Sequence, residues 1–415
     1  MVSIKVFSKR DCDKRSPHSY PLSPLCEGGG KSGEKKYLRK NKMTMDNEIR
    51  TRGHSERDLT VDSSTFYENY WQDARNISAT THSRNKAILD RFFPVRPRNQ
   101  QILEIGVGGE GGIIFLLKNE NKVCGIDVSS SAQRNCERLG LKIDVINLDT
   151  RGVPFEDETF DIVFAFEVFE HFANPQSVIE EIRRVLKPKG LFLVSIPNPL
   201  IHHWPRLFYP GLFEEKAFRE FLMINEFKII SKNNLGFNMY HQIYKDSSSG
   251  AFMWCWNCEK IDRDPKTFFD YGLYFWEQSN KEGIKTRPIE AIDMFRKSLE
   301  CEDRDNIQSR FFHTLSLLYR YIYRETEEFM KHAEWFMNGA QGDQYPLNMK
   351  SIFALLLLNF EMKKFGHEII DRESHETIVK GLQNFPGSEP YLEIIGKLKD
   401  GYLDYRLILE FLNND

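Results

Sequence analysis

The run of residues with the clearest chemistry joins a short apolar segment to a glycine-rich one. The apolar segment contains Ile102, Leu103 and Ile105, and residues 106–112 read Gly-Val-Gly-Gly-Glu-Gly-Gly. An apolar helical pattern follows over residues 113–117. Glycine lets the backbone approach a ligand closely, and the first turn of a helix offers free N–H groups to a negative group. The run therefore predicts a strand, a turn and a helix that hold a nucleotide-like ligand.

Three carboxylates stand beside or within apolar segments. Glu104 lies inside the first one, where it is expected to be buried and to hold a polar partner. Asp127 ends the run 123–126, about twenty residues after the glycines, where a carboxylate meets the ribose hydroxyls of an adenosine ligand. Its alternative role is to cap the helix after Ser129. Asp149 ends the next apolar run.

The glycine pattern alone leaves two alternatives open. Gly106, Gly108 and Gly111 satisfy the dinucleotide pattern G-x-G-x-x-G, which also predicts a nicotinamide-dependent oxidoreductase. A tight turn without any ligand is the second alternative. The segments that follow decide between them.

Apolar strands and amphipathic helices alternate after the glycine turn. Strands are predicted over 143–148, 160–166, 191–196, 227–231 and 251–258, and helices over 175–186 and 213–224. The last two strands are joined by a loop without a predicted helix, which is typical of an antiparallel hairpin. The pattern predicts an α/β domain with a mostly parallel sheet.

Four segments together resemble the class I S-adenosylmethionine-dependent methyltransferases, close to the ubiquinone/menaquinone-biosynthesis type. They read ILEIGVGGEGG, GIDVSSSAQ, LDTRGVPFEDETFDIVFAFEVFEHFANP and EEIRRVLKPKGLFLVSIPNP, and the resemblance spans roughly residues 100–262. It implies a seven-stranded Rossmann-like sheet in the order 3-2-1-4-5-7-6 with the last strand antiparallel. A dinucleotide dehydrogenase is not expected to carry the last two segments in this order.

The resemblance also implies S-adenosyl-L-methionine as the cofactor and a role for each binding residue. Gly106 and Gly108 leave room for its methionine portion, Glu104 orients its amino group, Asp127 binds the ribose hydroxyls, Asp149 accepts from the adenine amino group, and Phe166 and Glu167 lie beside the sulfonium. The family usually has a third glycine at position 110. Glu110 stands there instead, which puts Gly111 in doubt.

Methyl transfer requires that the protein position a nucleophile and exclude water. A hydroxyl nucleophile usually needs a base, for which histidine is suited near neutral pH. His171, after the fourth strand, is the first candidate, and His203, after the fifth, is the second. Each has a structural or substrate-orienting role as its alternative. The aromatic run 66–71 predicts a helix that either covers the cofactor or simply packs on the domain.

The expected acceptor is a hydroxyl or carbon of a small molecule, sugar or glycolipid. The loop after the fifth strand carries aromatic and histidine residues, and no Asn/Asp-Pro-Pro-Tyr motif of amine methylation follows the fourth strand. The net charge of −3 gives no overall case for nucleic acid. The alternative is a catalytically inactive cofactor-binding or scaffold protein, although Glu104, Asp127 and Asp149 are all present.

The sequence as a whole suggests three regions: 1–57, 58–263 and 264–415. The first is a basic segment with little periodicity, predicted to be disordered, and an over-extended gene start is its alternative. The second is the methyltransferase domain. The third reads as an all-α, tetratricopeptide-like domain that binds a protein partner, because residues 291, 295 and 298 and residues 333, 337 and 340 repeat a small–large–small spacing. An irregular helical domain is the alternative.

Cysteine usage and hydropathy place further limits on the protein. Cys255 and Cys258 lie on a predicted strand at positions that face opposite sides, so they are expected to be structural rather than to bind a metal. Seven cysteines without a pattern indicate a reducing compartment, and the cytoplasm is expected. The apolar stretch 352–360 is too short to span a membrane.

Overall fold

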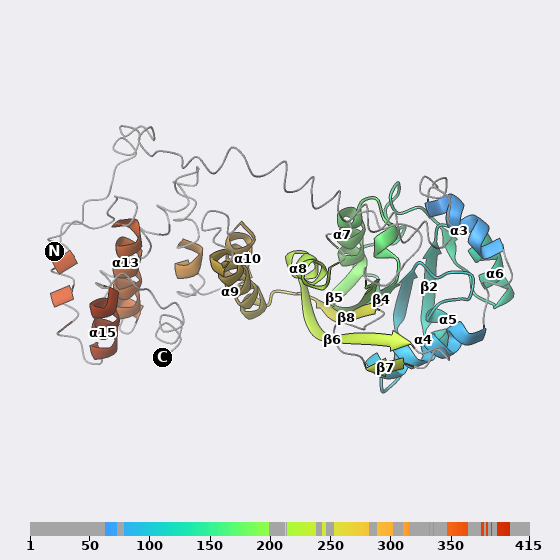
Figure 1. Ribbon diagram of the computed structural model, residues 1–415, viewed down its shortest axis with the longest axis horizontal. Helices are drawn as coiled ribbons and strands as arrows, with labels where there is room; N and C mark the ends of the chain where they lie inside the picture. Colours follow the sequence, from blue (N-terminus) through green and yellow to red (C-terminus); the bar gives the residue numbers. More distant parts are fainter. Residues whose placement is uncertain are drawn as a thin grey trace, which may run out of the picture. The chain divides into compact units, whose positions relative to one another are not determined.

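The computed structural model has two compact units, and the boundary between them in the sequence falls between Asp262 and Arg263 (Figure 1). The described residues are 63–72, 79–198, 212, 214–237, 243–245, 253–281, 289–301, 310–314, 332, 335, 347–363, 375–376, 379–380, 383 and 388–398.

The first unit is built on an eight-stranded sheet in the order β3-β2-β1-β4-β5-β8-β6-β7. Its strands are β1 (Gln101–Ile105), β2 (Lys122–Asp127), β3 (Asp144–Val145), β4 (Phe160–Phe166), β5 (Leu186–Pro197), β6 (Phe227–Phe237), β7 (Ile243–Lys245) and β8 (Met253–Lys260). The first five strands are parallel, and β8 runs antiparallel to both β5 and β6. The predicted order 3-2-1-4-5-7-6 is confirmed, since β8 is the predicted seventh strand.

Two details of the predicted sheet are corrected. The third strand was expected over 143–148 but consists only of Asp144–Val145, because Asn147 and the residues after it form a turn instead of continuing the ladder with β2. The short strand β7 was not predicted and adds an eighth, edge strand beside β6.

Helices cover both faces of this sheet (Figure 1). Helices α7 (Pro175–Val185) and α8 (Glu215–Ile224) pack on one apolar cluster. Helices α4 (Ala79–Phe92), α5 (Ile114–Leu117) and α6 (Ser130–Arg138) contribute to the other. Neighbouring strand residues alternate between the two clusters, as the two-residue period of a strand requires. The near-continuous apolar runs seen in the sequence are therefore explained by burial on both faces.

The two cysteines of β8 follow the same alternation. Cys255 belongs to the cluster under α4 and α5, whereas Cys258 belongs to the cluster under α7 and α8. Both thiols are buried and free, and burial raises the pKa of each. Their predicted orientation toward opposite faces is confirmed. Across the part of the chain that the structure describes, His, Cys, Asp and Glu side chains form no cluster suited to a metal ion.

The second unit contains helices α9 (Pro265–Lys281), α10 (Ile289–Cys301), α13 (Leu347–Lys363) and α15 (Glu389–Leu398). Helix α9 begins at Pro265, directly after Asp264. Asp264 explains this start, because its carboxylate accepts hydrogen bonds from Thr267 N (3.0 Å) and Thr267 Oγ1 (2.7 Å), and proline is favoured in the first helical turn. Helix α15 was not predicted.

Helices α9 and α10 form a close pair. Ala291, Phe295 and Ser298 are fully buried in α10, and Ser298 Oγ donates to Pro265 O at 2.8 Å. The second set of the spacing, residues 333, 337 and 340, lies outside the described residues. The tetratricopeptide-like repeat therefore stays a prediction. None of the described helices combines the length and the hydropathy that a bilayer crossing requires.

The α9–α10 contact gives a test with a matched control. A Cβ at Gly272 would come within 2.5 Å of the Phe295 ring, whereas a Cβ at Gly396, on an exposed part of α15, meets nothing within 4 Å. Gly272→Ala is therefore expected to destabilise the helical unit by about 1–3 kcal/mol. Gly396→Ala should stabilise it by roughly 0.5–1 kcal/mol. Calorimetric unfolding measures both, and equal effects of the two changes would contradict the packing.

Candidate functional site

A cavity of about 310 Å³ lies at the carboxyl ends of β1, β2 and β4. In a parallel sheet this edge is where ligands bind. The cavity is lined by every residue predicted to hold the cofactor: Glu104, Gly106, Gly108, Asp127, Asp149, Phe166 and Glu167. His171 lines it as well, whereas His203 lies outside the described residues.

Glu104 is buried and holds the start of the helix that follows the glycine turn. Its Oε1 accepts from Ile113 N at 3.1 Å, and its Oε2 accepts from Ile114 N at 3.0 Å. The prediction that this carboxylate holds a polar partner is confirmed. The expectation that these N–H groups stay open for an anionic ligand is wrong, since Glu104 itself occupies them. A pyrophosphate placed here would meet a carboxylate rather than a row of donors.

Asp127 organises the glycine turn from the end of β2. Its Oδ2 accepts from Gly108 N at 2.8 Å, and its Oδ1 accepts from Ser129 N at 2.9 Å. Burial raises the pKa of Asp127, and the hydrogen bond from Gly108 opposes that shift. The cap of α6 is Ser129, whose hydroxyl accepts from Ser131 N and Ala132 N. The helix-capping alternative therefore belongs to Ser129 and not to Asp127.

The glycines of the turn differ in whether they line the cavity. Gly106 (φ +74°) and Gly108 (φ +67°) line the cavity, and a Cβ at Gly108 would lie 2.8 Å from the ring of Trp71. Gly111 does not line the cavity but packs against Leu141 and Phe115. Glu110, where the family has a glycine, is buried at the cavity wall.

Asp149 and Asn147 form the cavity wall beyond β3. Asp149 is half-buried, and its Oδ1 accepts from Asn174 N at 3.1 Å. The amide N–H of Asp149 donates to Asn147 Oδ1 at 2.9 Å. Asn147 also lines the cavity but was missed from the sequence, because an asparagine in a turn carries no functional signal of its own.

Glu167 follows β4 with an unusual backbone. Its φ of +52° lies in the left-handed region, which a non-glycine residue adopts at a cost of about 1–2 kcal/mol. Ser195 of β5 holds it there: Glu167 N donates to Ser195 Oγ at 3.1 Å, and that hydroxyl donates to Glu167 Oε1 at 3.0 Å. Backbone strain that neighbours enforce in this way is concentrated at functional sites.

Helix α3 (Ser63–Gln72) closes the cavity from above the sheet edge. Phe66, Tyr67, Tyr70 and Trp71 all line it, so the interpretation of a covering helix is favoured over plain packing. With Phe166 and Phe172 they form an aromatic lining. Aromatic rings attract cations, and the described lining residues include no lysine or arginine.

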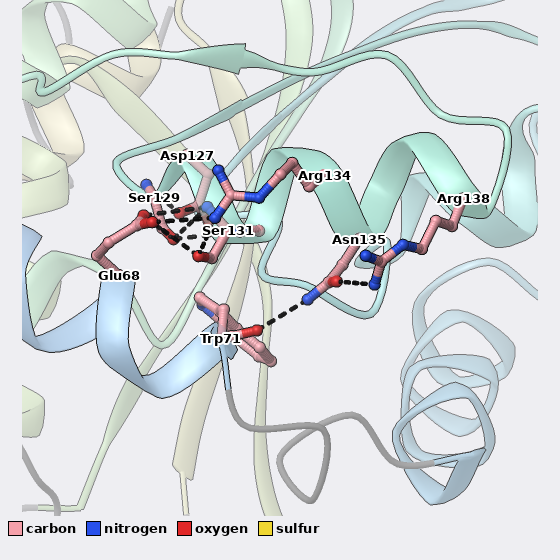
Figure 2. Close-up of polar contacts among 9 residues, drawn as sticks. Glu68, Trp71, Asp127, Ser129, Ser131, Arg134, Asn135 and Arg138 are labelled. Carbon is pink, nitrogen blue, oxygen red and sulfur yellow. Dashed lines mark hydrogen bonds and ion pairs between the residues drawn. The ribbon is translucent and has the colours of Figure 1, made fainter.

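Glu68 anchors this helix to α6 (Figure 2). Its Oε1 accepts from Ser131 Oγ at 2.7 Å, and its Oε2 accepts from Ser129 Oγ at 2.9 Å and from Ser131 N at 3.0 Å. The bond from Ser131 and the other donors lower the pKa of Glu68 to about 2. Trp71 O also accepts from Asn135 Nδ2 at 2.9 Å. Sequence reasoning missed this anchor because a glutamate inside an aromatic helix resembles an ordinary exposed residue.

The glycine turn gives a paired test. Gly108→Ala and Gly140→Ala both place a side chain at φ near +68° (+67° and +69°) and so carry a similar cost of about 1–2 kcal/mol. At Gly140 the nearest atom to a new Cβ is Lys118 Nζ at 3.5 Å, outside the cavity. We expect Gly108→Ala to lose binding of S-adenosylmethionine and Gly140→Ala to retain it, as measured by calorimetry. Equal losses would show that backbone strain alone is responsible.

The anchor at Glu68 gives a second test. Glu68→Gln weakens the charge-assisted bonds to Ser129 and Ser131, so α3 should exchange its amide hydrogens faster and affinity for the cofactor should fall about tenfold. The folded pKa lies below the usual 4.5. The contribution of this carboxylate to stability is therefore present above pH 4.5 and is lost as pH falls toward 2. Unchanged exchange in α3 would contradict the anchor.

Comparison with known proteins agrees with this geometry. Residues 103–194 match the family model of a methyltransferase domain. Similar proteins include 27-O-demethylrifamycin SV methyltransferase of Amycolatopsis mediterranei, with 29% identity over 147 residues (32% of this chain and 53% of that one). Ubiquinone biosynthesis O-methyltransferase of Pasteurella multocida is 31% identical over 121 residues (25% and 49%). Glycine/sarcosine/dimethylglycine N-methyltransferase of Actinopolyspora halophila is 26% identical over 211 residues (43% and 37%).

The chain spans about half the length, or less, of these curated relatives. Among solved structures, an S-adenosylmethionine-dependent methyltransferase from Thermotoga maritima aligns with 17% identity and a TM-score of 0.37, covering 47% of this chain and 97% of that one. The sequence matches support a class I methyltransferase domain in this chain and imply S-adenosylmethionine as its cofactor.

Proposed function

We propose that this protein is an S-adenosylmethionine-dependent methyltransferase that acts on a hydroxyl, or a carbon, of a small-molecule, sugar or glycolipid acceptor. One observation carries the proposal. The carboxylates of Glu104, Asp127 and Asp149 converge with Gly106 and Gly108 on one cavity, within a segment that matches the methyltransferase domain.

The lining residues suit this cofactor. Each carboxylate oxygen has two acceptor sites, so Glu104 and Asp127 can keep their backbone partners while they accept from an ammonium group and from ribose hydroxyls, respectively. Asp149 would accept from the adenine amino group. Gly106 and Gly108 would leave room for the methionine portion, since a Cβ at either position would collide with a side chain that lines the cavity, Val168 or Trp71.

Charge supports the same cofactor over a dinucleotide. When bound, S-adenosylmethionine supplies a methyl group that is already activated by a positive sulfonium. Glu104 and Asp127 occupy the N–H groups of Ile113, Ile114 and Gly108, so the glycine turn presents negative rather than positive potential. A pyrophosphate would be repelled there, whereas a cation would be attracted.

The acceptor is inferred from the residues near the end of β4. The aromatic side chains of α3, with Phe166, would exclude water from the reacting groups. His171 lies in the cavity wall as the candidate base, and a hydroxyl acceptor needs one. Two of the three relatives above are named for methylation of oxygen and one for nitrogen. His203 remains the second candidate base.

The domain assignment is part of the proposal. We assign the methyltransferase to residues 58–263 and a tetratricopeptide-like, partner-binding domain to residues 264–415. The unit boundary between Asp262 and Arg263 and the α9–α10 pair support this division. Free thiols in the described part of the chain support a reducing compartment such as the cytoplasm. A scaffold without catalysis is the alternative that the next experiment separates.

The function is tested by incubating the full chain with S-adenosylmethionine labelled in its methyl group and with small-molecule, glycolipid and protein fractions. We expect label to move into small-molecule or glycolipid hydroxyls and S-adenosylhomocysteine to form in equal amount. Label in amines or proteins would overturn the acceptor assignment. Cofactor binding without any transfer would favour the scaffold alternative.

The proposed contact of Asp149 with the cofactor predicts how much its removal weakens binding. Asp149→Ala removes an acceptor from the proposed adenine contact, and hydrogen bonds to charged groups contribute about 1.5–3 kcal/mol. The dissociation constant of S-adenosylmethionine should therefore rise roughly ten- to hundredfold. Asp157→Ala is the control, because this surface aspartate is 74% exposed and pairs with Arg184 outside the cavity. A similar loss in both variants would contradict the assigned contact.

A further inference from the structure

A tyrosine of the covering helix meets the candidate base. Tyr67 Oη lies 2.8 Å from His171 Nε2, although the two residues are 104 positions apart in sequence. Their rings also touch edge to face, with centroids 5.1 Å apart and an interplanar angle of 72°. Both residues line the cavity. Helix α3 thus brings a hydroxyl to the very nitrogen that a base would use.

One direction of this hydrogen bond suits proton transfer to His171. Burial, and next the charge of Glu170, raise the pKa of Tyr67 well above its usual value, so its hydroxyl keeps its proton at neutral pH. In that direction Tyr67 donates its proton to Nε2, and a neutral His171 carries its own proton on Nδ1. Glu170 Oε1 lies 3.7 Å from the same nitrogen and would stabilise an imidazolium there.

An acceptor cannot use His171 Nε2 directly while Tyr67 holds it. Glu68, the next residue of α3, fixes the helix to α6 through Ser129 and Ser131, so Tyr67 is held in place rather than free to swing away. Tyr67 is therefore the group that an acceptor hydroxyl in the cavity would meet, with His171 behind it. This inference rests on the proposed hydroxyl acceptor.

We propose that Tyr67 is a catalytic residue that relays the acceptor's proton to His171. The O–H bond of the acceptor breaks and its proton bonds to Tyr67 Oη, while the proton of Tyr67 moves to His171 Nε2. The electron pair left on the acceptor oxygen forms the new bond to the methyl carbon, and the pair of the broken carbon–sulfur bond stays on sulfur. His171 ends as an imidazolium beside Glu170, and charge is conserved.

The first test compares Tyr67→Phe with Asn69→Ala. Phenylalanine keeps the ring that packs against Phe66 and His171 but lacks the hydroxyl, and Asn69 is exposed on the same helix. Tyr67→Phe should lower kcat for a hydroxyl acceptor roughly 10²-fold, the usual scale of general base catalysis. Its dissociation constant for S-adenosylmethionine should stay within about twofold, and Asn69→Ala should leave both unchanged. A Tyr67→Phe enzyme with normal kcat would overturn the relay.

The pH profile separates a relay from a structural role. A relay that ends on a neutral base should make kcat of the wild type rise with pH, and Tyr67→Phe should lose this dependence together with its rate. The charged or titratable groups that face the pair are Glu170, Asp127, Tyr70 and Glu167. Because any of them could influence the rise of kcat with pH, this rise is assigned to His171 by isotope labelling of histidine. An unchanged profile in the variant would contradict the relay.

A measurement without cofactor or acceptor completes the test. Nitrogen NMR of labelled histidine should find His171 protonated on Nδ1 in the wild type, and a mixture of tautomers in Tyr67→Phe. The same tautomer population in both proteins would overturn the pairing. If the wild type methylates only amines, the acceptor assignment fails; if it methylates hydroxyls and Tyr67→Phe does so at full rate, the relay alone fails.

Discussion

The site depends on one interaction: the carboxylate of Glu104 accepts the two N–H groups that begin α5. A helix start after a glycine turn would ordinarily attract an anion. By occupying these donors from inside β1, Glu104 reverses the local charge and makes the sheet edge suitable for a cation. Asp127 does the same at Gly108 N. Two buried carboxylates, each stabilised by backbone donors, thus distinguish this cavity from the dinucleotide site that the pattern G-x-G-x-x-G would also predict.

Helix α3 turns this sheet edge into a cavity. It precedes the matched segment 103–194 in the chain, yet it supplies much of the aromatic lining. Glu68 holds it on α6 (Figure 2). Trp71 covers Gly108 so closely that no side chain fits there. The helix also places Tyr67 against His171. In the proposed mechanism, cofactor binding and proton transfer therefore both depend on this helix.

Most of the sheet could be predicted because its strands are buried on both faces and read as apolar runs. The residues at their ends were found for the same reason, since a polar residue after such a run is conspicuous. Contacts between distant segments left no such signal: Glu68 reaches Ser131 across 63 positions. The left-handed backbone of Glu167 depends on Ser195 of another strand. The start of α9 could have been read from Asp264 and Pro265, whose capping pattern was overlooked.

The central claim is that the glycine turn of this chain holds a cationic adenosyl cofactor and not a dinucleotide. Calorimetric titration of the full chain with S-adenosylmethionine and, separately, with nicotinamide adenine dinucleotide tests it most directly. We expect saturable binding of S-adenosylmethionine in the micromolar range or tighter and no heat of binding from the dinucleotide. Binding of the dinucleotide, or of neither compound, would contradict it.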